Sequence, residues 1–226
     1  MLFKALKCHI KYLSPDNKLY KLISGCFKNC KGPTHNFTIK LDKIYEIERA
    51  IEKVRYYPFQ SLFNKRLLWH GSRITNFVGI FSQGLRVAPP DAPSSGYMFG
   101  KGIYFTNVPT KAAQYCNCTK DQDEGLLLLC EVALGNMYPQ ESSHVFKSPP
   151  IGYHSVMGVG KMGPECAGLT DIESGMNTNV NIGLDIGGIV ANENEKSLQL
   201  QYSEFVVYDC SQVRIRYACK VRLTQT

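Results

Sequence analysis

The sequence lacks an apolar run long enough to cross a membrane. Its longest, Leu126 to Cys130, is far shorter than the roughly 20 residues that a transmembrane helix needs. The N-terminal segment MLFKALKCHIKYL is interrupted by Lys4, Lys7 and Lys11 and has no small-residue cleavage site, so it is not typical of a secretory signal. We therefore expect an intracellular protein without a membrane partner.

Several common catalytic signatures are also missing. The sequence has no P-loop, no HExxH, no GxSxG, and no GxGxxG that opens a helix after a strand. The missing signatures therefore exclude four enzyme classes for this chain: P-loop nucleotide hydrolases, zinc proteases of the HExxH type, α/β-hydrolases and Rossmann dehydrogenases.

Cysteine spacing gives little support to a metal site. The nine cysteines are odd in number and scattered, and several lie in apolar surroundings, such as Cys130 and Cys219. Cys26/Cys30 and Cys116/Cys118 are local pairs, but neither is matched by a second pair in a form typical of structural zinc. We expect buried free thiols and no metal.

The chain has no basic block that would indicate a DNA-binding groove. Its net charge of +7 is spread over the whole sequence, without a run of five or more basic residues. The charge favours an anionic partner, such as a nucleotide or nucleic acid, but its dispersion is typical of a solvated surface rather than a DNA-binding groove, so we do not expect the domain to require nucleic acid. A length of 226 residues with 44% hydrophobic content is that of one sizeable globular domain, so we expect residues 1–226 to form a single domain.

Capping and breaking residues predict three helices. Ser14 is the expected N-cap of the first, with Pro15 in its first turn and Gly32-Pro33 beyond its end. The second spans Asn76 to Gln83 and is ended by Gly84. The third is a short helix from Pro109 to Tyr115.

Apolar segments predict strands, which are listed here: Arg66 to His70, Gly102 to Thr106, Gly125 to Leu134, Tyr202 to Tyr208 and Val213 to Leu223. The segment from Phe37 to Val54 is ambiguous between strand and helix. Residues 88–100 and the Gly-, Pro- and Asn-rich residues 138–181 are expected to be irregular. The pattern alone therefore predicts an α+β domain dominated by antiparallel strands.

Three stretches place chemically useful side chains beside apolar strands. They are RLLWHGSR (66–73), GYMFGKGIYF (96–105) and LQYSEFVVYD (200–209), which carry His70, Tyr104 and Glu204. Taken singly, each has a structural explanation: a satisfied histidine, a core tyrosine and a solvent-facing glutamate.

Together, the three stretches resemble the catalytic domain of the poly(ADP-ribose) polymerases. The similarity extends through GLR, APP, LLLLCEVALGNMY, HSVMGVGK and SQVRIRY, with weaker matches at THN (34–36) and YYPF (56–59). It covers nearly the whole chain except about residues 162–180. The resemblance implies the ADP-ribosyltransferase fold: a split, strongly twisted antiparallel β core of two sheets with short flanking helices. It also implies that Phe37 to Glu48 is a strand.

The resemblance implies an enzyme that releases nicotinamide from NAD⁺ and transfers ADP-ribose to a protein or to a growing ADP-ribose chain. Its catalytic triad corresponds to His70, Tyr104 and Glu204. Tyr104 and Tyr115 would sandwich the planar nicotinamide ring. Glu204 would bond the nicotinamide-ribose hydroxyl and offset the positive charge of an oxocarbenium-like ribose. NAD⁺ is thus the expected co-substrate, and no metal is needed.

The remaining site residues follow from the same resemblance. The nicotinamide end would involve Gly71, whose backbone can approach the carboxamide closely, and Tyr97 on a covering loop. Lys111 falls near the catalytic glutamate. The resemblance implies contacts with the adenosine side of NAD⁺ for five residues: His70, Ser72, Asn76, Gly84 and Arg86. It places Tyr202 and Met98 on the acceptor side.

Two features depart from the family pattern. Ala112 stands where relatives carry a serine whose hydroxyl bonds the carboxamide, and losing that bond weakens binding by about three- to tenfold. In addition, the sequence begins almost directly at the catalytic core. We therefore expect no helical regulatory subdomain and no DNA-binding module within it. It is either a fragment of a longer protein or a minimal enzyme that does not need DNA breaks.

Retention of Glu204 and a long acceptor-side loop, residues 138–165, favour polymer synthesis, with automodification among the expected outcomes. Three alternatives stay open: a mono-ADP-ribosyltransferase, a catalytically weak NAD⁺- or ADP-ribose-binding module, and a nucleic-acid-binding repair adaptor. A nuclear location is implied by the resemblance, with the cytoplasm as the alternative.

Overall fold

The computed structural model describes residues 6–89, 91, 96–165, 169–173 and 181–225. The α-helices in these ranges are short: α2 (Lys18–Asn29), α3 (Ala50–Tyr56), α4 (Phe77–Gln83) and α5 (Pro109–Ala113). Single 3₁₀ turns lie at Tyr57–Phe59, Ile74–Asn76, Gln114–Cys116, Glu195–Ser197 and Cys210–Gln212. None of the helices described is long and apolar enough to cross a membrane.

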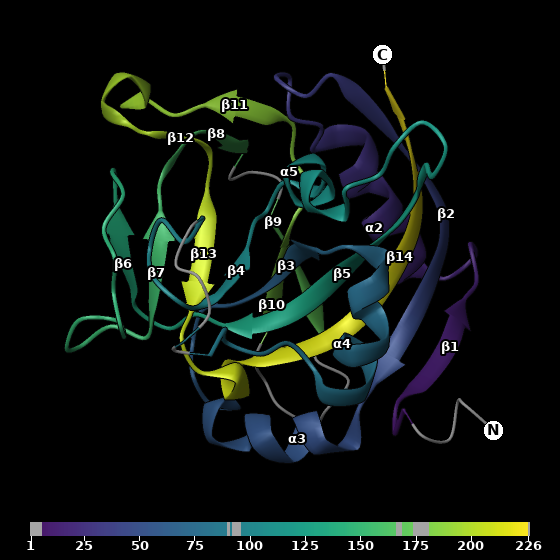
Figure 1. Ribbon diagram of the computed structural model, residues 1–226, viewed down its shortest axis with the longest axis horizontal. Helices are drawn as coiled ribbons and strands as arrows, with labels where there is room; N and C mark the ends of the chain where they lie inside the picture. Colours follow the sequence, from purple (N-terminus) through teal and green to yellow (C-terminus); the bar gives the residue numbers. More distant parts are fainter. Residues whose placement is uncertain (1–5, 90, 92–95, 166–168, 174–180, 226) are drawn as a thin grey trace.

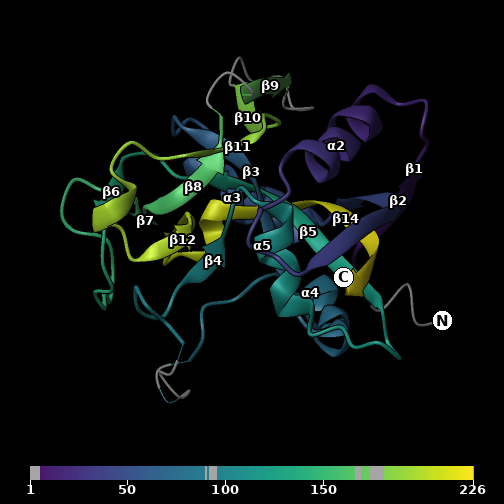
Figure 2. The ribbon, with the colours of Figure 1, turned by 90° about the horizontal axis from the view of Figure 1, so that it is seen from above.

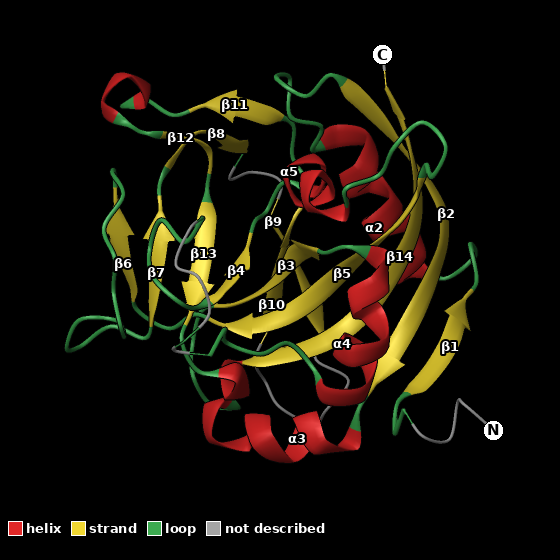
Figure 3. Ribbon diagram, in the orientation of Figure 1, coloured by secondary structure: helices red, strands yellow, loops and turns green. Residues whose placement is uncertain are grey.

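A seven-stranded sheet forms the larger half of the molecule, and most of its neighbouring strands are antiparallel (Figures 1 and 3). Its order is β1 (His9–Leu13), β2 (Phe37–Glu48), β14 (Val213–Gln225), β5 (Glu124–Ala133), β3 (Lys65–Gly71), β10 (Asn181–Asp185) and β9 (Leu169–Glu173). Among the strand pairs described in this sheet, only β10–β3 is parallel. Strands from both ends of the chain thus lie side by side in one sheet.

Two smaller sheets form the other half. The four-stranded sheet has the order β4 (Ile103–Phe105), β13 (Glu204–Val207), β7 (Ser155–Gly158) and β6 (Met137–Gln140). The three-stranded sheet has the order β11 (Ile189–Ala191), β8 (Gly160–Pro164) and β12 (Leu200–Tyr202). A backbone bridge between Trp69 and Thr106 joins the first of these to the seven-stranded sheet.

Strand β5 explains why helices cover both faces of the large sheet. Leu127 and Leu129 point to the side where Ile23 of α2 is buried, and Leu128 points to the opposite side with Phe77 of α4. Because successive strand residues face opposite sides, a continuous apolar run is buried on both. Figure 2 accordingly shows α2 and α4 on opposite sides of β5.

The main structural predictions are confirmed. The chain is α+β, and its β core is split between the seven-stranded and four-stranded sheets, with the three-stranded sheet as an addition. Phe37–Glu48 is one continuous strand. The eight cysteines within the described ranges are free thiols, and these five are buried: Cys26, Cys30, Cys116, Cys130 and Cys219. Cys166 lies outside the described residues.

The predicted start of the first helix is wrong. Ser14 does not cap it: its hydroxyl accepts from the backbone of Asp16, two residues on, and so forms a local turn. Asn17 is the N-cap, and its side chain accepts a 2.8 Å hydrogen bond from the Leu19 backbone. Serine and asparagine are both preferred N-cap residues, and the helix uses the one that directly precedes its first residue, Lys18.

The described residues within 138–181 do not form an irregular loop as expected. They contain β7, β8 and β9 and most of β6. Two of the glycines that indicated a loop are instead sites of close packing: a Cβ at Gly158 would lie 2.4 Å from the Phe99 ring, and one at Gly160 would lie 2.3 Å from the Ser203 nitrogen. Likewise, Tyr202–Tyr208 is not one strand, because β12 ends at Tyr202 and β13 begins at Glu204 in a different sheet.

Candidate active site

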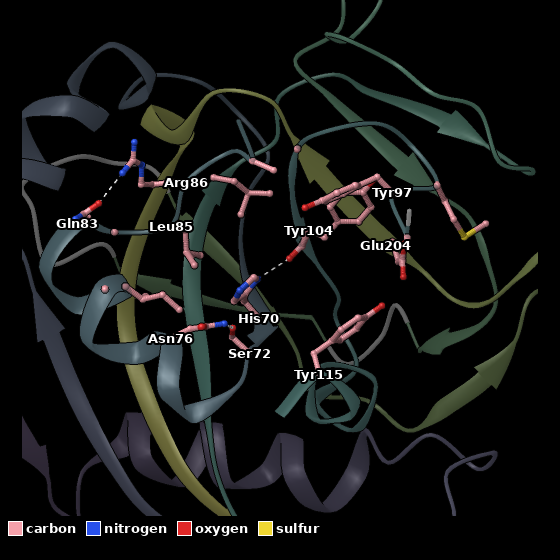
Figure 4. A pocket seen from close by; sticks show the side chains of 18 of the residues that line it. His70, Ser72, Asn76, Gln83, Leu85, Arg86, Tyr97, Tyr104, Tyr115 and Glu204 are labelled. Atoms are coloured by element: carbon pink, nitrogen blue, oxygen red, sulfur yellow. Dashed lines mark hydrogen bonds between the residues drawn. The ribbon is translucent and has the colours of Figure 1, made fainter. Parts of the chain in front are cut away.

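A cavity of about 800 Å³ opens between α4, β4 and the residues that precede β4 (Figure 4). A smaller recess of about 80 Å³ continues it, between the end of β3 and α5. Five residues line both spaces: His70, Tyr104, Lys111, Tyr115 and Glu204. The combined space is large enough for a dinucleotide, since small-molecule sites commonly measure about 300–1,000 Å³.

The structure brings together all the predicted site residues except one. The larger cavity is lined by Ser72, Asn76, Gly84, Arg86, Tyr97 and Met98 in addition to the five shared residues. The smaller recess adds Gly71 and Ala112. Tyr202 lines neither space, because its side chain is only 2% exposed and its hydroxyl contacts Thr34.

His70 is held in one tautomer. Its Nδ1 lies 2.9 Å from the backbone carbonyl oxygen of Tyr104, and because a carbonyl can only accept, Nδ1 carries the proton and donates. Burial lowers the pKa of His70, and the bond to Tyr104 only partly opposes that shift. The neutral ring therefore offers Nε2 as an acceptor for a ligand hydroxyl.

Tyr104 presents its ring to the cavity but not its hydroxyl. The hydroxyl donates to the Gly100 carbonyl at 2.7 Å and accepts from the Phe99 backbone at 2.9 Å. Burial raises the pKa of Tyr104, so the hydroxyl keeps the proton that it donates. The ring of Tyr97 lies 6.0 Å from that of Tyr104. Tyr104 thus fixes the loop before β4 and supplies an aromatic face.

Tyr115 follows α5 and lies across the cavity from Tyr97 and Tyr104 (Figure 4). Its side chain is 54% exposed and lines both the cavity and the recess. Lys111 Nζ lies 5.7 Å from the centre of its ring. The two aromatic sides form a slot suited to a planar ring.

Glu204 begins β13 at the edge of this slot. Its side chain is almost fully buried, and Lys111 Nζ lies 3.3 Å from its Oε1. A buried carboxylate needs such compensation, because desolvation of an isolated charge is costly. The Glu204 carboxylate is thereby paired at this edge, where it can accept from a ligand hydroxyl or face a developing positive charge.

Gly71 and Ala112 meet at the bottom of the recess. A Cβ at Gly71 would lie 1.8 Å from the carbonyl oxygen of Ala112, so only glycine fits. The Ala112 side chain is buried and has no hydrogen-bonding group, as the sequence indicated. Any amide entering this recess would therefore meet backbone groups of Gly71 and no hydroxyl at position 112.

The wider end of the cavity is polar. Asn76 Nδ2 donates to Ser72 Oγ at 3.0 Å, and Arg86 donates to Gln83 at 2.6 Å. Gly84 has φ +81°, a left-handed conformation that favours glycine. The exposed guanidinium of Arg86 gives this end a positive charge suited to a nucleotide.

Sequence reasoning missed part of the lining. Gln83 lines the cavity and accepts a hydrogen bond from Arg86. In the sequence, only the three-residue spacing of Gln83 and Arg86 could have indicated this pair. Apolar lining residues, Ile80, Leu85, Ile103 and Leu200, gave no signal because they look like ordinary core positions. Within the described ranges, no group of His, Cys, Asp and Glu side chains could hold a metal ion.

Comparison with known proteins points to one family. The sequence pattern described as "Poly(ADP-ribose) polymerase catalytic domain" matches residues 17–223. Poly [ADP-ribose] polymerase 1 of Gallus gallus is 45% identical over 222 residues, which are 97% of this chain and 21% of that protein. The protein of the same name from Danio rerio is 43% identical over 223 residues, and Poly [ADP-ribose] polymerase 2 of Arabidopsis thaliana is 37% identical over 222.

These relatives are much longer than the chain, which spans 21% of the first two and 34% of the third. The matched segment includes β3, β4, α5 and β13, the elements that supply His70, Tyr104, Lys111 and Glu204. The chain belongs to the family of poly(ADP-ribose) polymerase catalytic domains.

Proposed function

We propose that the chain is an NAD⁺-dependent ADP-ribosyltransferase that releases nicotinamide and builds poly(ADP-ribose) on protein acceptors, itself included. The observation that carries the proposal is the convergence of His70, Tyr104, Tyr115 and Glu204 on one cavity. NAD⁺ is the co-substrate. A nuclear location accompanies the proposal by analogy with the family.

The residues supply what the reaction requires. The nicotinamide ring is cationic in NAD⁺ and leaves as a neutral molecule, so its departure needs no acid. The Tyr104–Tyr115 slot would hold the ring, and the Gly71 backbone would bond its carboxamide. His70 Nε2 would accept from the adenine-side ribose hydroxyl and fix the register of the ligand. Each of these steps concerns binding and orientation.

Glu204 has the electrostatic role. As the glycosidic bond lengthens, positive charge develops on the ribose, and a nearby carboxylate lowers the free energy of that state. Lys111 Nζ lies 3.3 Å from the carboxylate and would hold its orientation. The carboxylate would also accept a proton from the attacking acceptor hydroxyl, so that attack forms the new glycosidic bond while nicotinamide leaves.

We further propose that the described elements act as a single domain. Strands β1 and β2, from the start of the chain, pair with β14 at its end within one sheet, and this supports a common folding unit. Nicked DNA added to the purified protein tests for a DNA-dependent switch. Unchanged turnover is expected, and strong stimulation would contradict DNA-independent activity.

Incubation with labelled NAD⁺ tests the activity. Wild type is expected to give a ladder of labelled products, and Glu204→Gln short adducts only, because a neutral amide neither offsets charge nor accepts a proton. A single discrete adduct from wild type would instead indicate a mono-ADP-ribosyltransferase. Binding of NAD⁺ without labelled product would indicate a silent binding module.

A further inference from the structure

A turn near the N-terminus contacts both elements that carry the Lys111–Glu204 pair. This turn, residues 32–35, connects the end of α2 to β2. The Gly32 backbone donates to Thr110 Oγ1 at 2.9 Å, and Thr110 directly precedes Lys111. The Thr34 backbone donates to the hydroxyl of Tyr202 at 3.1 Å. Tyr202 lies two residues before Glu204.

The contacts with Tyr202 involve its ring as well as its hydroxyl. Thr34 Oγ1 lies 2.7 Å from the Tyr202 hydroxyl oxygen. The imidazole of His35 stacks on the phenol ring, with centres 4.9 Å apart and planes inclined by 27°. Since Tyr202 is buried outside the cavity, these contacts fix its position rather than present it to a ligand.

The turn is closely fitted to Tyr202. A Cβ at Gly32 would lie 2.5 Å from the Tyr202 hydroxyl and 2.6 Å from His35 Nδ1, which leaves no room for a side chain. Tyr202 in turn pairs with Met162 of β8, so it cannot shift without disturbing a sheet. The turn therefore packs against the last residue of β12, two residues before the start of β13.

We propose that Thr34 and His35 are positioning residues for ADP-ribosyl transfer. Through Tyr202 they set the place of Glu204, and through Gly32 and Thr110 the same turn sets the place of Lys111. This inference rests on the proposed function. Its physical basis is that displacement of a catalytic group by about 1 Å can lower a rate on the order of 100-fold.

Thr34→Val and Thr34→Ser form the main test. Valine keeps the branched shape and removes the hydroxyl, whereas serine keeps the hydroxyl. Val is expected to lower kcat for transfer about three- to tenfold, the effect of one lost hydrogen bond, with the KM for NAD⁺ unchanged. Ser is expected to retain the wild-type kcat. Thr38→Val, on the exposed side of β2, is the matched control and should change neither constant.

A double-variant comparison tests the shared bond. Tyr202→Phe removes this contact and also the acceptor of the Thr34 backbone N–H, so it should lower kcat at least as far as Thr34→Val does. The combination should be no worse than Tyr202→Phe alone, because that variant already lacks the contact that Thr34→Val removes. His35→Phe should keep the stacking and the rate, whereas His35→Ala should lose both. Melting temperatures of all variants identify any that fail to fold.

The inference is overturned by an unchanged kcat in Thr34→Val, by an equal loss in Thr34→Ser, or by additive losses in the double variant. The carboxyl-carbon resonance of Glu204 gives a readout that needs no turnover. It should move in Thr34→Val and Tyr202→Phe but not in Thr34→Ser, and an unmoved resonance would contradict the positioning role. If wild type transfers no ADP-ribose, the proposed function fails while the resonance still decides the positioning role.

Discussion

The hydroxyl of Tyr104 donates a 2.7 Å hydrogen bond to the backbone carbonyl of Gly100, four residues earlier in the chain. It also accepts from the Phe99 backbone, so its hydrogen-bonding capacity is directed into the loop and away from the cavity. Tyr104 is therefore a loop anchor as well as an aromatic face. Its contribution to ligand binding is separable into these two parts.

Tyr104→Phe separates them. The ring remains, but two backbone groups lose a partner at about 0.5–1.5 kcal/mol each. We expect the KM for NAD⁺ to rise by about tenfold, with a smaller fall in kcat, because the loop with Tyr97 and Met98 is loosened while the slot persists. Steady-state kinetics measure this. Unchanged constants would show that the hydroxyl does not support the loop.

Lys111→Met tests the ion pair with Glu204. Methionine preserves most of the side-chain length and removes the charge, which leaves a buried carboxylate without compensation. We expect kcat to fall by at least about tenfold, since breaking a buried pair costs more than the 1.4 kcal/mol that a tenfold change represents. Lys111→Arg should retain part of the activity. Equal activity of the Met variant and wild type would contradict the role of the pair.

Ala112→Ser introduces the hydroxyl that the family resemblance implies at this position. The added hydroxyl lies in the small recess, where it would bond the carboxamide. We expect the KM for NAD⁺ and the Kd of benzamide, a nicotinamide mimic, to fall about three- to tenfold. Calorimetry with benzamide gives the second constant. If both constants stay the same, the missing hydroxyl does not limit binding.

Gly71→Ala tests the close approach at the bottom of the recess. Its Cβ would collide with the Ala112 carbonyl at 1.8 Å, so we expect a marked fall in the free energy of unfolding. Gly25→Ala in α2 is the matched control. No atom lies within 4 Å of its Cβ, and alanine should stabilise the helix by about 0.5–1 kcal/mol. Urea unfolding should show a lower free energy of unfolding for Gly71→Ala and a higher one for Gly25→Ala. An unchanged free energy of unfolding in Gly71→Ala would contradict the geometry.

Acid should destabilise the fold through two histidines. Burial lowers the pKa of His70 and, together with nearby Lys111, that of His35. Below the ordinary pKa of about 6.5 the unfolded chain takes up protons that the folded chain does not. The contribution of the two histidines to the free energy of unfolding should therefore be complete above about pH 6.5 and should decrease as the pH falls. Urea unfolding of wild type and His35→Phe measures it, and equal pH slopes would exclude His35 as a contributor.

Much of the site could be predicted from the sequence because its residues lie in dense local motifs. His70 and Gly71 end an apolar strand, and Tyr104 lies within another, so their placement follows from local structure. Their convergence with Glu204 depends on long-range strand pairing, which periodicity does not reveal. Family resemblance supplied that link.

The rest could not be predicted because it depends on tertiary contacts. The strands within residues 138–181 form by pairing with distant partners, such as β7 with β13, and Gly158 and Gly160 allow close packing. Tyr202 was expected at the acceptor side, but its burial against Thr34 and His35 joins segments far apart in the sequence. Asn17 rather than Ser14 caps the first helix, and sequence rules do not separate two capping residues that lie so close together.

The central claim is that this cavity cleaves NAD⁺ and passes its ADP-ribose to an acceptor with the help of Glu204. The most direct measurement follows nicotinamide release and acceptor labelling together, in purified wild type and in Glu204→Gln. We predict that wild type releases nicotinamide in step with labelling and extends chains, and that Glu204→Gln loses extension. A folded wild-type protein that binds NAD⁺ yet releases no nicotinamide would contradict the account.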